Sequence, residues 1–114
     1  MNIQVIGTKK CKETQKAERF FKERRINYQF RDLTEKGLSK GELDNIMNVF
    51  SEDELIDPQS KEYQKRGLAY MVYNKVNEIL ENPLVLKTPI VRNGRKATLG
   101  YDPEKWTEWI KSES

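Results

Sequence analysis

The sequence contains no histidine and a single cysteine, Cys11, among its 114 residues. Without histidine, a protein lacks the side chain that most often serves as a general base and metal ligand near neutral pH. One cysteine cannot form a disulfide within the chain. These absences argue against a zinc site and against catalysis by Ser-His or Cys-His pairs, and we predict neither a metal nor a tightly bound cofactor.

Long apolar runs and a strong excess of one charge are also absent. The opening MNIQVIGTKKC lacks the apolar run of a signal peptide, and no segment approaches the roughly 18 apolar residues of a membrane span. The 21 basic and 18 acidic residues are largely interleaved and leave a net charge of only +3, which steers anions weakly. We therefore expect a cytoplasmic protein without membrane contact or direct nucleic-acid binding.

The first third of the chain has the pattern of a strand, a helix and a second strand. Residues 2–6 alternate as a strand that ends at Gly7, and "INYQFRDL" places apolar residues at period two. Between them, a helix is predicted from near Cys11 to near Arg25, with one buried face formed by Thr14, Ala17, Phe20 and Phe21. This order predicts a βαβ unit with a right-handed crossover.

The middle third is predicted to be helical. Ser39 and Glu42 have the spacing of a capping box, and the helix that follows carries Leu43, Ile46, Met47 and Phe50 on one face. Asp57 and Pro58 are predicted to begin a short helix that ends at Gly67. A further helix is predicted to stop at Asn82-Pro83 and to carry Met71, Val72, Val76, Ile79 and Leu80.

The last third predicts two strands and a helix. "TPIVRNGRKATLGY" suggests two short strands around a tight turn at Asn93-Gly94, where both turn residues would need positive φ. Asp102 and Pro103 are predicted to start a terminal helix whose apolar stripe of Trp106, Trp109 and Ile110 packs in the core. We predict one α/β domain, residues 1–114, with a thioredoxin-like βαβ…ββα core (1–34 and 86–114), a four-stranded mixed sheet and a helical insertion (35–85).

Three stretches carry a family resemblance: Gly7 to Ala17, the "TPIV" of residues 88–91 and the "LGYDPEKW" of residues 99–106. The chain resembles the arsenate reductase (ArsC)/Spx family throughout its length. The resemblance implies a thioredoxin-like fold and a redox-active Cys11 that attacks an oxidised substrate. It also implies that external thiols of the glutathione or glutaredoxin type, with glutathione as co-substrate, then accept the oxidation. Pro89 falls where the family's proline takes the cis form.

The departures from the family pattern argue against arsenate as the substrate. Family arsenate reducers hold the oxyanion with three arginines, and the matching positions here are Gln59, Thr88 and Tyr101. Loss of three charged, bidentate side chains removes most of the charge complementarity for a divalent oxyanion. Lys12-Glu13 also replaces the small polar loop that follows the nucleophile, which adds a carboxylate near the pocket.

The Spx branch of the family, whose members bind RNA polymerase and alter transcription, gives a second hypothesis. "QSKEYQK" (residues 59–65) and "GYD" echo that branch. Spx-type switches use a Cys-x-x-Cys pair, whereas the second position here is Thr14, so a disulfide switch within the loop is impossible. The chain is predicted to be either a thiol-dependent oxidoreductase or an Spx-like regulator or binding module that contacts RNA polymerase through its helical insertion.

Cys11 has two interpretations: it is either a reactive thiol or a buried, inert side chain. The first turn of a helix and the neighbouring Lys9, Lys10 and Lys12 favour the thiolate. Thr14 either donates a hydrogen bond to the sulfur or only packs. The other candidate binding residues are Lys10, Lys12, Thr88, Pro89, Arg92 and Tyr101. Alternatively, Arg92 is only a solvent-exposed strand residue, and Tyr101 only packs beneath the last helix.

Overall fold

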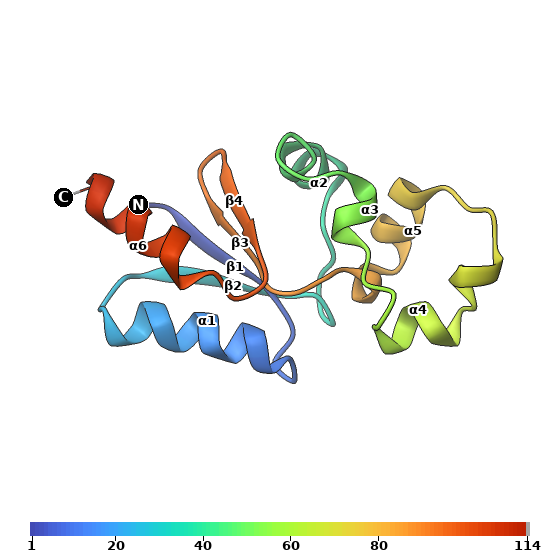
Figure 1. Ribbon diagram of the computed structural model, residues 1–114, viewed down its shortest axis with the longest axis horizontal. Helices are drawn as coiled ribbons and strands as arrows, with labels where there is room; N and C mark the ends of the chain where they lie inside the picture. The colour runs from blue at the N-terminus through green and yellow to red at the C-terminus, as the bar shows by residue number, and fades with distance from the viewer. Residues whose placement is uncertain (114) are drawn as a thin grey trace. The chain divides into compact units, whose positions relative to one another are not determined.

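The computed structural model describes residues 1–113, which form two compact units (Figure 1). Unit 1 combines residues 1–32 with the C-terminal part of the chain from Thr88 onward, and unit 2 comprises Leu33–Lys87. None of the described helices is long and apolar enough to cross a membrane. The segments that the sequence predicts as βαβ and ββα lie together in unit 1.

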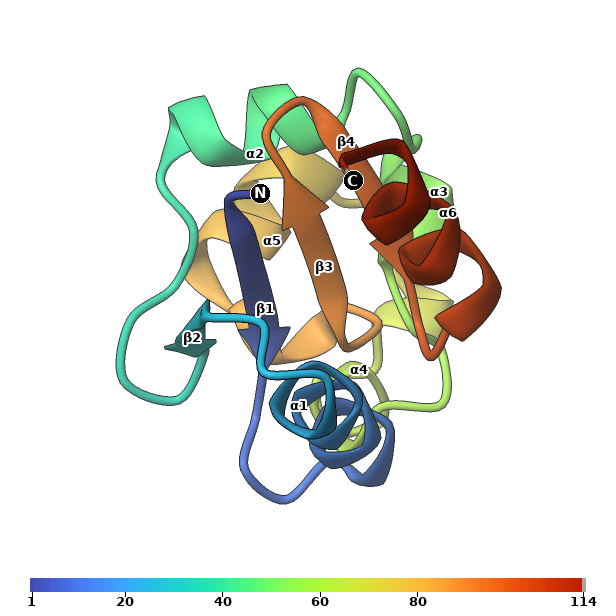
Figure 2. The same ribbon diagram turned by 90° about the vertical axis from the view of Figure 1, so that its left-hand side faces the viewer.

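Unit 1 is built on one four-stranded sheet in the order β2-β1-β3-β4. Strand β1 (Ile3–Gly7) pairs in parallel with β2 (Tyr28–Asp32) and antiparallel with β3 (Ile90–Asn93), which pairs antiparallel with β4 (Lys96–Leu99). Helix α1 (Lys12–Glu23) connects β1 to β2, and α6 (Pro103–Glu113) follows β4 (Figure 2). The predicted α/β fold with a mixed four-stranded sheet is confirmed.

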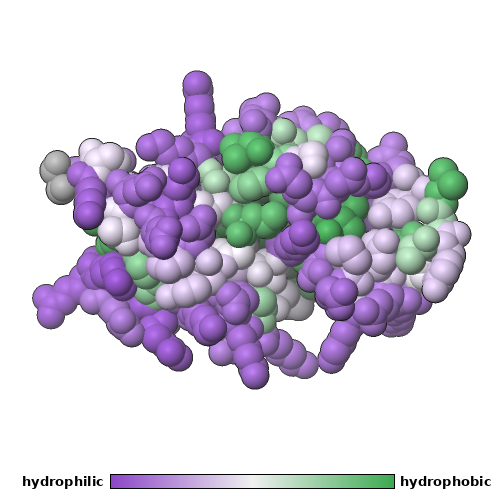
Figure 3. Space-filling model, viewed as in Figure 1, coloured by the Kyte–Doolittle hydropathy of each residue, from purple (hydrophilic) through white to green (hydrophobic). Residues whose placement is uncertain are grey.

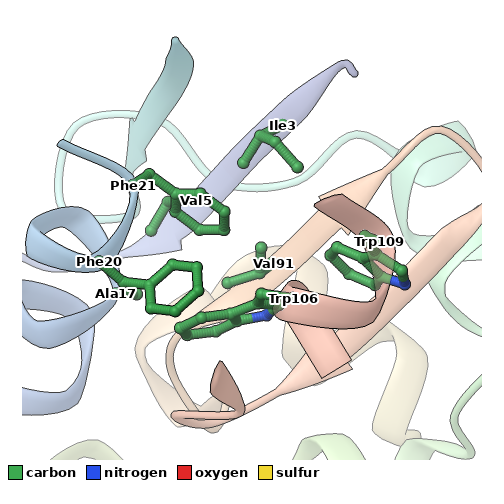
Figure 4. Packing of buried hydrophobic residues seen from close by; sticks show 8 residues of the cluster. All are labelled: Ile3, Val5, Ala17, Phe20, Phe21, Val91, Trp106 and Trp109. Atoms are coloured by element: carbon green, nitrogen blue, oxygen red, sulfur yellow. The ribbon is translucent and has the colours of Figure 1, made fainter. Parts of the chain in front are cut away.

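Helices α1 and α6 pack on the same face of the sheet because their apolar stripes share one core. Alternation along β1 and β3 directs Ile3, Val5 and Val91 to this face. The helices contribute Ala17, Phe20, Phe21, Trp106 and Trp109, all buried (Figure 4). The Trp106 indole lies edge-on to Phe20 and donates its Nε1–H to Thr98 Oγ1 at 2.7 Å, so its single polar group is satisfied within the core. The predicted apolar faces of both helices are confirmed.

Unit 2 consists of short helices: α2 (Lys40–Ile46), α3 (Glu52–Leu55), α4 (Lys61–Lys65) and α5 (Lys75–Glu81), with 3-10 turns at Leu68–Tyr70 and Pro83–Val85. The capping box predicted for α2 is present, because the Glu42 amide donates to Ser39 Oγ and the Ser39 amide donates to the Glu42 carboxylate. A second capping box, Ser51 with Glu54, begins α3, a helix that the sequence analysis did not predict.

Three helix boundaries predicted in unit 2 were wrong. Helix α4 begins after the cap residue Ser60 rather than at Asp57-Pro58, because the Asp57 carboxylate accepts the Gln59 amide in a local turn. Helix α2 ends at Ile46, so Phe50 lies beyond it. Helix α5 begins after Asn74, which caps it, and leaves Met71 and Val72 in an exposed extended segment.

The β3–β4 turn also differs from its prediction. Asn93 pairs with Lys96, so the two loop residues are Gly94 and Arg95 instead of Asn93 and Gly94. Among the described residues of this loop, only Gly94 has positive φ, at 61°. In type II′ hairpin turns only the first loop residue has positive φ, and that residue is usually glycine.

Candidate active site around Cys11

Cys11 lies between the end of β1 and the start of α1. The strand ends at Gly7, the chain turns, and the Cys11 amide donates to the Thr8 carbonyl at 3.2 Å. Cys11 is the N-cap residue of α1 and has extended backbone torsions, φ −76° and ψ 117°. Its side chain is partly exposed. This position places the sulfur beside the unpaired amide groups of the first helical turn.

Thr88 is the side chain that contacts the sulfur from the second half of unit 1. Its hydroxyl donates to Cys11 Sγ at an Oγ1–Sγ distance of 3.1 Å, and Sγ lies 3.8 Å from the Thr88 carbonyl oxygen. The Thr88–Pro89 peptide bond is cis, and β3 begins at the next residue. The structure thus brings together Cys11, Thr88 and Pro89, which are about 77 positions apart in the sequence.

The pKa of the Cys11 thiol is lowered from its ordinary value of 9.0. Partial burial raises the pKa, but hydrogen bonding from the Thr14 and Thr88 side chains and from the Thr14 and Glu13 amides outweighs it. The main lowering contributions therefore come from neutral donors, and not from Lys9, Lys10 and Lys12 as the sequence predicts. Lys9, Lys10 and Lys12 are exposed, where solvent screens their charges.

Thr14 lies one helical turn after Cys11 and is fully buried. Among residues 1–113, its hydroxyl oxygen has no hydrogen-bond partner, although the same hydroxyl is one of the groups that lower the pKa of Cys11. A hydroxyl without a partner is available to donate to a thiolate when the sulfur ionises. Of the two readings from the sequence, the structure favours a donor that packs.

Gly7 allows Thr14 to occupy this position. A Cβ at residue 7 would lie only 2.3 Å from Thr14 Oγ1, with the Thr14 methyl group almost as close. Glycine at the end of β1 therefore permits the first turn of α1 to approach the strand. The sequence pattern predicts Gly7 only as the end of a strand, because its contact with the helix depends on tertiary packing.

Two of the remaining predicted site residues, Arg92 and Tyr101, have contacts with other side chains. Arg92 faces Gln4 across the β1–β3 ladder and donates to its side-chain oxygen at 3.1 Å. The Tyr101 ring packs edge-on against Trp106 at a centroid distance of 5.6 Å, beneath the last helix as the alternative reading had it. Gln59, which the resemblance matches to an arginine of the arsenate reducers, is an exposed residue of unit 2.

The chain is similar in sequence to known transcriptional regulators. The chain is 31% identical over 115 residues to the global transcriptional regulator Spx 2 of Oceanobacillus iheyensis, covering 96% of this chain and 84% of that protein. It is 25% identical over 108 residues to the global transcriptional regulator Spx of Staphylococcus saprophyticus, covering 90% and 82%.

Solved structures share the fold. An arsenate reductase from Vibrio cholerae superposes with a TM-score of 0.78 at 18% identity, covering 95% of this chain and 97% of that one. The family model of ArsC matches residues 6–109, which include Cys11, Thr88, Pro89, all of α1 and the first part of α6. The chain belongs to the ArsC family.

Proposed function

We propose that this protein is a thiol-dependent oxidoreductase in which Cys11 is the nucleophile. The observation that supports the proposal is the hydroxyl of Thr88, which donates to Cys11 Sγ at 3.1 Å from the residue that precedes the cis proline. A donor at this distance stabilises the thiolate in a partly exposed position that a substrate can reach. An inert cysteine of the core would need neither the donor nor the exposure.

The reaction proposed for Cys11 is thiol–disulfide exchange. The thiolate attacks one sulfur of a disulfide, a new S–S bond forms to Cys11, and the second sulfur departs as a thiolate. A second thiol must then release Cys11 by the same step. Since the chain has one cysteine, that thiol comes from outside, and we assign this role to glutathione or a glutaredoxin-like protein.

Intact-mass spectrometry after treatment with oxidised glutathione tests the proposal. We expect one glutathione adduct, removed by glutaredoxin with reduced glutathione and absent from Cys11→Ser. The pH profile of iodoacetamide alkylation should place the Cys11 pKa below 9.0, in the direction that its donors give it. An unmodified protein, under conditions that modify an exposed model thiol, would refute the nucleophilic role.

The alternative is an Spx-like regulator that contacts RNA polymerase. It is supported by the 31% identity to a transcriptional regulator over nearly the whole chain. Unit 2 also exposes neighbouring large side chains: Tyr70 is 94% exposed, and Met71 and Val72 are exposed beside it. A contiguous exposed apolar segment of this kind is typical of a surface that binds another protein.

The alternative predicts that function depends on unit 2 rather than on Cys11. RNA polymerase should be retained by the wild-type protein and by Cys11→Ser, but lost with Tyr70→Ala and Val72→Asp combined, because these changes remove the exposed apolar area. An exposed substitution such as Lys36→Ala is the control. Equal retention of polymerase by all variants, or by none including the wild type, would reject this alternative.

A further inference from the structure

The margin of the sheet in unit 1 borders a hollow that the proposed function does not use. Within the described part of the chain, β2 pairs only with β1 and is therefore an edge strand (Figure 2). Beside it lies a hollow of about 500 Å³, which we call the edge hollow. It is lined by residues of α1, of the turn after α1 and of β2: Glu18, Lys22, Arg25, Ile26, Tyr28 and Phe30.

Strand β2 offers its outer backbone to a further strand. In a strand with one neighbour, every second residue directs its N–H and C=O groups away from that neighbour. Gln29 is exposed, and Tyr28 and Phe30 on either side of it are only half-buried. Tyr28 and Phe30 pack against the core on the α1 face of the sheet, because side chains alternate along a strand. A strand added beside β2 would therefore direct every second side chain toward the edge hollow.

The edge hollow carries an excess of positive charge. The Tyr28 hydroxyl donates to the Glu18 carboxylate at 3.0 Å, and burial together with this carboxylate raises the pKa of Tyr28 to about 12. The one carboxylate of the hollow thus already has a hydrogen bond. Lys22 and Arg25 are exposed, and their side chains form no ion pair or hydrogen bond within residues 1–113. Hydrophilic side chains also project from the side of unit 1 that α1 covers (Figure 3), so charge selects a partner there.

Arg25 has a backbone conformation that favours glycine. Its φ is 57°, and it is the one non-glycine residue with positive φ among residues 1–113. The Ile26 amide donates to the Phe21 carbonyl oxygen at 2.9 Å and the Arg25 amide to that of Lys22 at 3.0 Å, the two hydrogen bonds of a Schellman motif. Glycine usually occupies this position, because a Cβ makes left-handed backbone unfavourable. The arginine therefore costs stability, and an anionic ligand for its side chain would account for it.

From these observations we propose that the edge hollow binds an extended acidic segment of another protein, which adds to the sheet beside β2. The segment pairs through its main chain with β2, presents carboxylates to Lys22 and Arg25, and packs an apolar side chain against Phe30. A second copy of this chain is disfavoured, because pairing of two β2 strands would bring Lys22 and Arg25 of both copies onto one interface, where like charges repel. The site does not involve Cys11 and is independent of the proposed function.

Amide chemical-shift mapping of the isotope-labelled full chain by nuclear magnetic resonance tests the proposal. The probe is the acetylated and amidated peptide Glu-Thr-Val-Thr-Glu-Thr, whose glutamates and valine share one face of an extended strand. One control peptide has lysine in place of each glutamate. A second control has methylated amide nitrogens, which removes the donors for pairing with β2.

The acidic peptide is titrated into wild type, Arg25→Gly, Arg25→Gly combined with Lys22→Gln, and Arg19→Gln. The matched control is Arg19→Gln, because Arg19 is an exposed cation of the same helix that lines a separate hollow with Tyr101. Arg19→Gln removes the same charge from the protein as Arg25→Gly does.

We expect saturable shifts centred on residues 22–32 with the acidic peptide and none with either control peptide. The affinity should fall about threefold in Arg25→Gly and about tenfold in the double variant, and stay unchanged in Arg19→Gln. Urea denaturation should show Arg25→Gly to be more stable than wild type, because glycine relieves the left-handed backbone.

Several results would overturn the proposal. Equal binding of a control peptide excludes the charge contact or the main-chain pairing, and an equal loss of affinity in Arg19→Gln excludes a role for the edge hollow. If millimolar acidic peptide causes no shifts, Lys22 and Arg25 only guard the edge strand against pairing. If the protein without peptide self-associates through β2, the occupant is a second copy and not an acidic segment.

Discussion

At the scale of single residues, the hydroxyl groups of two threonines lower the pKa of the Cys11 thiol. Thr88 already donates to Cys11 Sγ, whereas the Thr14 hydroxyl is buried and has no partner among the described residues. A buried hydroxyl without a partner costs about 1–3 kcal/mol of stability. Most buried polar groups in proteins have a partner, and we propose that the Thr14 hydroxyl serves as a donor to the Cys11 thiolate.

Thr14→Val replaces the hydroxyl with a methyl group of similar size. We expect the pKa of Cys11 to rise, because one of the donors that lower it is lost. Iodoacetamide alkylation should then become half-maximal at a higher pH. The free energy of unfolding should stay the same or increase by about 1 kcal/mol, because the buried hydroxyl had no partner to lose.

Thr14→Ser is the matched control, since it keeps the hydroxyl and should leave the pKa of Cys11 close to that of the wild type. Urea denaturation of both variants separates a change in pKa from a change in fold. If Thr14→Val and the wild type share the same alkylation profile, Thr14 is a packing residue and does not act on the sulfur.

At the scale of secondary-structure elements, short helices depend on their caps and on contacts between helices. Helices of four to seven residues are not stable alone, so those of unit 2 need partners. Arg66, at the end of α4, forms a two-pronged ion pair with Glu78 of α5. The Glu78 side chain is only 8% exposed, whereas that of Arg66 is 37% exposed. The pair therefore joins α4 to α5 around a buried carboxylate.

Arg66→Met removes the cation and leaves the Glu78 carboxylate buried without its partner. We expect the free energy of unfolding to fall, and to fall further than when an exposed pair is broken, because the buried Glu78 carboxylate loses its charged partner. Urea denaturation followed by circular dichroism measures the change.

The control is Lys40→Met, which breaks the exposed pair between Lys40 and Asp44 at 2.6 Å. Exposed pairs contribute little, so its loss should cost about 0.5 kcal/mol or less. If Arg66→Met and Lys40→Met lower the free energy of unfolding equally, the burial of Glu78 does not make the α4–α5 pair more stabilising than an exposed pair.

At the scale of the whole molecule, the chain has the ArsC family fold with other side chains at the positions that the resemblance assigns to arsenate. The family model spans residues 6–109, and the fold matches a solved arsenate reductase. The three positions that hold arsenate by resemblance carry Gln59, Thr88 and Tyr101, none of them charged. In this structure Thr88 contacts the sulfur and Tyr101 packs on Trp106. The scaffold therefore places Cys11 in a family fold whose three matching positions carry neutral side chains.

A coupled assay with glutaredoxin, glutathione and NADPH should show no arsenate-dependent NADPH oxidation above background. The physical reason is that neutral side chains cannot replace three bidentate cations around a divalent oxyanion. An established arsenate reductase in the same assay is the positive control. Robust turnover by this protein would mean that cations such as Lys12 or Arg92 form a new anion site.

The sequence by itself determined the elements of unit 1 and its core. Period-two alternation in β1 and β2 and the apolar stripe of α1 and α6 are local patterns, and burial follows them directly. It also determined the capping box of α2 and, through three short motifs, the family. Local patterns predicted unit 2 less well. Asp57 accepts a hydrogen bond within a turn instead of capping a helix, and Met71 and Val72 are exposed instead of lying on the buried face of a helix.

Only the tertiary structure decided what surrounds Cys11. The Thr88 hydroxyl reaches the sulfur because β3 pairs beside β1, a contact across 77 positions that no local periodicity encodes. The approach of Thr14 to Gly7 and the grouping of Lys16, Arg19 and Arg24 against Tyr101 likewise depend on how α1 packs on the sheet and beside α6. Sequence patterns record which face of each element is apolar, whereas the chemistry of a thiol depends on polar groups that packing brings within a few ångströms of it.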